Sequence, residues 1–237
     1  MPQDFGADTA IAVLLIFACW WGYSFVLSRL RGGPINAKLE SVRADWIAAM
    51  TDRTMRPFDA ILIGHITNAL AFFGSATLIV LAGLISSFAS IKTVHELVSE
   101  LDFVTPVSLE LFELQLGFVA VVLAISFFSF TYALRKLIYV IALIGALPHT
   151  SDNCPTLGAM VGATATVLSE AIKTFNFGIR GYYYAVSAVC LLASPAASIA
   201  VTIAVTAVLF YRQLSTRTSA AIDVYVEAAK SMPKRQM

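Results

Sequence analysis

The sequence predicts an all-α integral membrane protein with four transmembrane helices, amphipathic interfacial helices and a cytoplasmic helical hairpin that extends the third span. Of the 237 residues, 58% are hydrophobic and only 13% are charged, against about 25% charged in an ordinary soluble domain. The stretch from Leu116 to Leu147 is apolar except for Arg135 and Lys136. As a helix it would be about 48 Å long, whereas the hydrocarbon layer is about 30 Å thick. We therefore expect it to project beyond the bilayer after the basic pair, where its apolar surface requires a protein partner.

The composition also limits the function. The net charge is +1 and no basic run alternates with aromatic residues, so nucleic acid is not an expected partner. Cys19, Cys154 and Cys190 lack the spacing of a metal site or a disulfide framework. No nucleophile and base pair and no glycine-rich phosphate loop stands out. We expect a non-enzymatic protein of one membrane domain (residues 1–237), with no catalytic residue, cofactor or metal.

The first span is predicted at residues 10–28, as a retained anchor, because a cleaved signal peptide would carry its positive charges before the apolar run. An amphipathic helix follows at residues 36–50, and it lies either on the membrane surface or on neighbouring helices. The positive-inside rule places this loop in the cytoplasm and the amino terminus outside. Its basic residues are Arg29, Arg31, Lys38, Arg43, Arg53 and Arg56.

The second span, residues 60–88, carries His65 and Asn68 three positions apart, and therefore on one helical face. Polar side chains are costly in lipid unless they face another helix. Two interpretations remain open: Asn68 bonds a neighbouring helix while His65 reaches the interface, or both line a polar pathway. Small residues four positions apart in the same span suit close helix approach.

The next connector, residues 89–103, has an apolar stripe opposite acidic residues and predicts a second amphipathic helix. Lys92 is its only lysine or arginine, so we expect this connector outside the cell. The third span, with its extension, occupies residues 111–147. A third amphipathic helix, residues 157–176, is expected to cover the apolar extension and complete the cytoplasmic hairpin.

The last span is predicted at residues 182–211, with Pro195 as a kink inside it. Gly178 and Gly181 flank Arg180, and Tyr183 lies in an aromatic belt. We expect Arg180 to be a structural pivot that pairs with a carboxylate such as Glu170 or binds backbone carbonyls; the alternative is a role in a polar pathway.

The polar tail, residues 212–237, follows four spans and is therefore expected outside. It carries basic residues of its own, which conflicts with the positive-inside rule. We keep this orientation because the first loop and the region from Arg135 to Arg180 hold more basic charge.

Three segments resemble a known family: Ile63–Thr77, the aromatic run from Phe127 to Lys136, and Gly178–Tyr183 followed by an apolar span with a proline. The family consists of bacterial and plant membrane proteins catalogued as domain of unknown function 599. The resemblance implies a four-helix membrane fold and no chemistry. Ser194 stands where the family tends to have glycine. We expect the protein in the inner (cytoplasmic) membrane of a bacterium.

Two functions follow as expectations. The first is an oligomeric structural or accessory component of a membrane assembly, with the lipid bilayer and copies of itself or a larger complex as partners. The second is an oligomeric ion channel or small-solute transporter. Its polar pathway would lie near His65, Asn68, Arg135 and Arg180.

Overall fold

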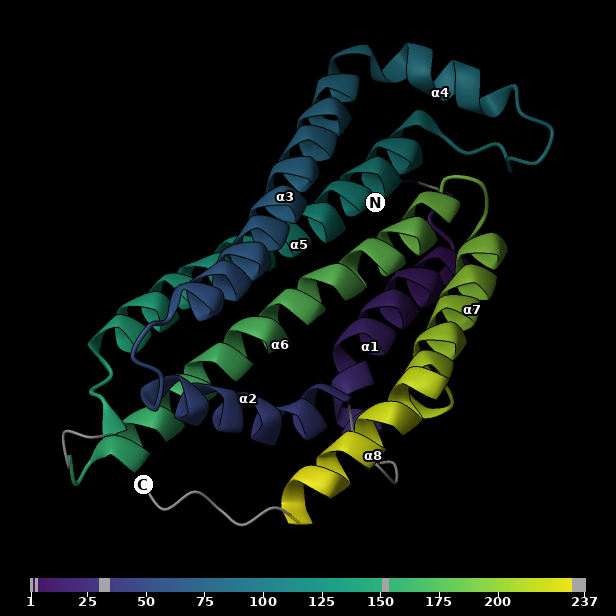
Figure 1. Ribbon diagram of the computed structural model, residues 1–237. Coiled ribbons are helices and arrows are strands. Elements are labelled where there is room, and N and C mark those ends of the chain that lie inside the picture. The colour runs from purple at the N-terminus through teal and green to yellow at the C-terminus, as the bar shows by residue number, and fades with distance from the viewer. Residues whose placement is uncertain (1, 3, 30–34, 151–153, 232–237) are drawn as a thin grey trace. The chain divides into compact units, whose positions relative to one another are not determined.

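A computed structural model describes residues 2, 4–29, 35–150 and 154–231. All regular structure in these ranges is helical (Figure 1). The helices are α1 (Ala7–Arg29), α2 (Ile35–Thr51), α3 (Pro57–Ser87), the short 3-10 helix η1 (Phe88–Ser90), α4 (Ile91–Ser99), α5 (Leu109–Ala146), α6 (Leu157–Cys190), α7 (Pro195–Leu214) and α8 (Arg217–Ser231). Among the described residues, four helical stretches are long and apolar enough to cross a membrane, and they begin at Ala7, Pro57, Leu109 and Pro195.

The chain forms two compact units. Unit 1 comprises Met1–Arg29, Gly74–Phe128 and Phe177–Phe210, and unit 2 comprises Leu30–Phe73, Ser129–Asn176 and Tyr211–Met237. Helices α3, α5, α6 and α7 each contribute one part to unit 1 and another to unit 2.

The core of unit 1 is built around Trp20 of α1 and Tyr184 of α6, both fully buried. Val122 of α5 and Leu209 of α7 pack in the same cluster. Large aromatic side chains at the centre bury much apolar area, and each also keeps a polar atom that needs a partner. Trp20 donates from Nε1 to the carbonyl oxygen of Phe177 at 3.1 Å, and the Tyr184 hydroxyl lies 3.0 Å from that of Thr206.

The core of unit 2 confirms that the extension of the third span packs on the helix predicted at residues 157–176. Leu137 and Val140 of α5 share one apolar cluster with Val161 and Leu168 of α6. Helix α2 joins this cluster through Ile47, which is fully buried. The sequence leaves open whether α2 lies on the membrane surface or on neighbouring helices, and in unit 2 it packs on neighbouring helices.

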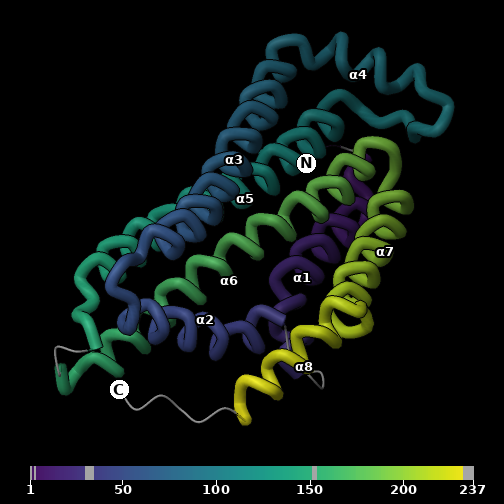
Figure 2. Tube along the Cα trace, in the orientation of Figure 1, coloured from purple at the N-terminus to yellow at the C-terminus, as the bar shows by residue number. Residues whose placement is uncertain are grey.

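The last span differs from the prediction. Residues 182–211 are not one kinked helix: α6 ends at Cys190, a turn follows, and α7 begins at Pro195. Figure 2 shows the chain reversing there. The Ser194 hydroxyl accepts a hydrogen bond from the backbone N–H of Ala197 at 3.1 Å, so Ser194 caps α7 and Pro195 occupies the first helical position, where its missing N–H costs nothing.

Three chain segments meet at one end of unit 1. The Asp4 carboxylate accepts hydrogen bonds from the backbone N–H and the hydroxyl of Ser108, at 2.6 and 2.7 Å. The backbone N–H of Thr105 donates to the carbonyl of Ala193 at 2.8 Å. The start of α1, the start of α5 and the α6–α7 turn are therefore neighbours. Helices α1, α5 and α7 run away from this end, and α6 runs toward it.

The carboxy-terminal tail is helical from Arg217 to Ser231. Helix α8 packs on α2 in unit 2, where Lys38 and Asp223 form an ion pair at 2.6 Å and the Gln213 side chain accepts a bond from the N–H of Ile35 at 3.1 Å. The tail and the first loop thus lie together within unit 2.

Candidate functional site

His65 and Asn68 lie on an exposed face of α3. Neither makes a hydrogen bond within the described part of the chain, so the expected bond from Asn68 to a neighbouring helix is not seen there. Their face carries a longer exposed series, in which the spacing alternates between four and three residues. We call it the α3 stripe; its members are Ile61, His65, Asn68, Phe72, Ser75, Ile79, Ala82 and Ser86. This spacing is that of a coiled-coil seam.

Arg135, Lys136 and Glu170 form contacts within unit 2. Arg135 donates from Nε to the Tyr139 hydroxyl at 2.7 Å. The Lys136 ammonium donates to the Thr174 hydroxyl at 2.7 Å and lies 3.9 Å from the Glu170 carboxylate. These bonds join α5 to α6 and leave Arg135 on the surface, bound to its own helix.

Arg180 does not pair with Glu170, which corrects the expected partner: the Glu170 carboxylate accepts from Lys173 at 3.1 Å. In unit 1 the guanidinium of Arg180 donates from Nη2 to the Ser24 hydroxyl at 3.0 Å. It also lies 5.0 Å from the ring centroid of Tyr23 and 5.7 Å from that of Phe177. These contacts are cation–π in geometry. Among the described residues the buried Nε has no acceptor. Arg180 therefore joins α6 to α1 within unit 1.

The residues flanking Arg180 serve helix packing. Gly178 and Gly181 are both buried. A Cβ on Gly181 would lie 1.9 Å from the Ser126 hydroxyl and 2.6 Å from the Trp20 ring, so only glycine fits where α6 passes α1 and α5. Tyr183 is half-buried in the same unit.

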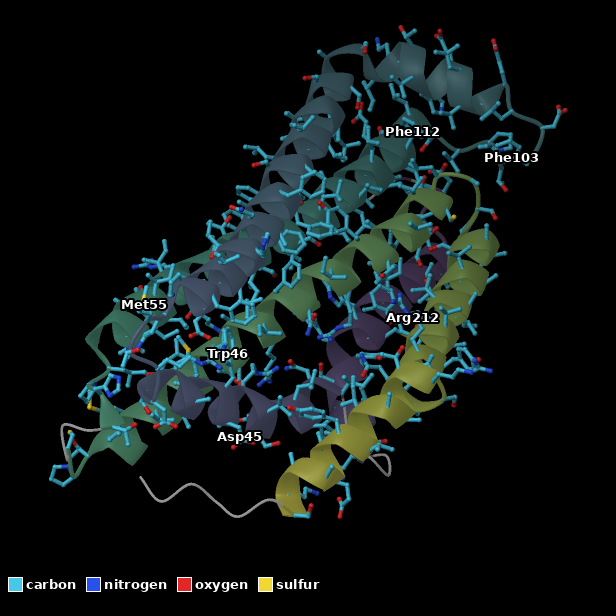
Figure 3. All side chains as sticks on the ribbon, in the orientation of Figure 1. Asp45, Trp46, Met55, Phe103, Phe112 and Arg212 are labelled. Carbon is cyan, nitrogen blue, oxygen red and sulfur yellow. The ribbon has the colours of Figure 1, made fainter. Side chains whose placement is uncertain are left out.

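A buried carboxylate anchors the start of α3. Asp59 is fully buried, and its Oδ1 accepts a bond from the Trp46 indole at 2.9 Å and pairs with Arg53. Figure 3 shows Trp46 and Asp45 on opposite faces of α2, with Asp45 pointing away from the unit. The sequence does not predict these contacts of Asp59, because a tryptophan at position 46 is equally compatible with a helix on the membrane surface.

Unit 2 also contains a cavity of about 500 Å³ between α3, α5 and the end of α2. Its lining is mainly apolar, with a single charged residue, Arg56. The lining residues are Met50, Arg56, Ala60, Ile63, Gly64, Thr67, Asn68, Ile141, Ile144 and Gly145. A mostly apolar pocket with a few polar groups at its ends is the usual form of a site for a small ligand. Within the described ranges, no three His, Cys, Asp or Glu side chains gather as a metal site would require.

Comparison with known proteins places the chain in a family. No curated protein and no solved structure matches it significantly. The family described as "Protein of unknown function, DUF599" matches residues 11–218. This match covers most of the chain and includes all three segments on which the resemblance rested. The chain belongs to the DUF599 family.

Proposed function

We propose that this protein is a structural or accessory component of a membrane assembly, and that it associates with copies of itself through the α3 stripe. The observation that carries this proposal is the exposure of the stripe. Ile61, Phe72 and Ile79 are 58%, 68% and 73% exposed. Only 11% of the most apolar window of the span that begins at Pro57 is buried, against 44% for α5.

The polar members of the stripe argue for a protein partner. Lipid offers no hydrogen bonds, so His65 and Asn68 are costly on a face that only acyl chains cover. Asn and His side chains that bond across helices contribute about 0.6–2 kcal/mol each in membranes. Ser75, Ala82 and Ser86 are small enough for two backbones to approach closely.

A second copy is the partner that fits these residues best. Two copies in one membrane share the same orientation, so a two-fold axis along the membrane normal brings each stripe against itself. His65 and Asn68 of one copy would then meet the same residues of the other. The channel alternative has less support, because Arg135 and Arg180 are each bound to a side chain of their own unit.

The orientation follows from the direction of α6. Since α6 runs toward the end of unit 1 from which α1, α5 and α7 depart, we propose that α6 is a fifth crossing. An odd number of crossings brings the tail to the same side as the first loop, in agreement with the Lys38–Asp223 pair. Apart from Arg29, Lys92 and Arg180, every lysine and arginine in the described ranges belongs to unit 2. By the positive-inside rule we propose that the first loop and the tail lie in the cytoplasm and the amino terminus outside.

Measurement of mass in mild detergent by light scattering tests the self-association. Asn68→Leu removes the interhelical bonds, and the loss of about 0.6–2 kcal/mol should raise the dissociation constant about 3- to 30-fold. Ser75→Trp should separate the copies by steric clash. Val80→Trp is the matched control: Val80 is 52% exposed on the same helix, outside the stripe.

The expected result is an oligomer for the unchanged protein and for Val80→Trp, and smaller particles for the two stripe variants. If both stripe variants form particles of the same mass as the unchanged protein, any oligomer uses another surface.

A further inference from the structure

We propose that the cavity of unit 2 binds an anionic membrane lipid, with the headgroup at Arg56 and an acyl chain along the groove between α3 and α5. The groove exists because two residues lack side chains. An added Cβ on Gly64 or on Gly145 would meet nothing within 4 Å, so the two glycines and Ala60 leave open the space that larger residues would fill. From Ala60 to Asn68 the groove follows about 12 Å of helix.

Arg56 provides the charge that selects the headgroup. It lies directly before Pro57, the first residue of α3. Its Nη1 makes only two long bonds, of 3.4 Å each, to the carbonyls of Ile144 and Leu147 at the end of α5. No carboxylate of the described chain pairs with it, since Asp59 is engaged by Arg53 and Trp46. The guanidinium therefore retains N–H donors for a phosphate, which it can bind in bidentate fashion.

The walls and the rim favour a lipid over a water-soluble anion. Ile63 and Ile144 face the groove from opposite helices. Ile141, a third apolar residue of the lining, is 47% exposed, so the groove opens to the surface, where an acyl chain can enter it. A soluble phosphate would gain nothing from these apolar walls, whereas a lipid chain exchanges one apolar environment for another and keeps its headgroup at the charged end. Asn68, at the other end, belongs also to the α3 stripe.

Lipid binding can be measured by native mass spectrometry of the full chain in detergent. Phosphatidylglycerol and phosphatidylcholine with identical acyl chains are added in turn, and bound lipid per chain is counted. We expect one phosphatidylglycerol per chain to be retained at least several-fold better than phosphatidylcholine. Arg56→Gln should abolish the difference between the two lipids. Gly64→Leu and Gly145→Leu should each abolish retention of both, by filling the groove.

Two controls match these variants. Arg217→Gln removes an exposed arginine of α8, and Gly22→Leu fills open space beside a helical glycine of α1; both should bind lipid as the unchanged protein does. Equal retention of both lipids by the unchanged protein would overturn the proposal. So would retention unchanged in Arg56→Gln and both groove variants, or thermal stabilisation by inorganic phosphate alone that equals that by phosphatidylglycerol. The count is per chain, so its outcome is independent of whether the protein forms an oligomer.

Discussion

Some positions in unit 1 have no room for a side chain larger than the one present. Gly181 is the clearest case, because the Ser126 hydroxyl and the Trp20 ring occupy the space that a methyl group would need. Trp20 cannot move away easily, since it is fully buried, stacks on the Phe177 ring at 5.0 Å between centroids and donates to the Phe177 carbonyl. One glycine therefore sets how closely α6 approaches α1 and α5.

The prediction at this scale is that Gly181→Ala destabilises the protein. Overpacking a filled core costs about 1–3 kcal/mol, and the rigid indole leaves little room for relaxation. Thermal unfolding in detergent should show a lower midpoint for this variant. Gly117→Ala on α5 is the control, because a Cβ there meets nothing within 4 Å. Equal stability of Gly181→Ala and the unchanged protein would mean that the helices are less tightly packed than described.

Among the helices, α6 differs most from what the sequence predicts. The sequence predicts its first part as an amphipathic helix and its last part as the start of a separate apolar span. The prediction separates them because glycines and an arginine lie between the two parts. In fact, α6 is continuous from Leu157 to Cys190. Glycine and arginine are tolerated in mid-helix here since Gly181 permits close packing and Arg180 binds Ser24 and aromatic rings. Such tertiary contacts have no signature in a single sequence.

The sequence predicts where the apolar spans begin more accurately than it predicts the extent of α6. Spans beginning near Ala10, Ala60 and Leu111 agree with α1, α3 and α5, because length and hydropathy alone decide them. The sequence identifies the polar residues as candidate functional residues, but it does not predict which of them lie together. His65 and Asn68 share one helix face, as their spacing requires, whereas the partners of Lys136 and Arg180 depend on how distant segments pack.

The proposed crossing by α6 can be tested by labelling with an impermeant thiol reagent in intact cells. Single cysteines replace Lys38, Asp223 and Glu96 in turn, in a chain whose own three cysteines are changed to serine. We expect the first two positions to be protected and the third to react, because five crossings bring α2 and α8 to the cytoplasmic side. Reaction at Asp223→Cys but not at Lys38→Cys would restore the four-span arrangement.

The whole molecule is a set of helices that exposes large apolar areas, and the α3 stripe is the part of this surface whose polar and small residues lipid does not explain. We propose that a second copy of the chain covers it. Disulfide cross-linking in the native membrane, in the same cysteine-free chain, tests whether two stripes meet. Ser75→Cys and Ile79→Cys lie on the stripe, and Val80→Cys lies outside it. We expect cross-linked dimers to form rapidly for the first two variants and hardly at all for the third. Rapid cross-linking at Val80→Cys, with none at Ser75→Cys or Ile79→Cys, would show that a second copy does not cover the stripe.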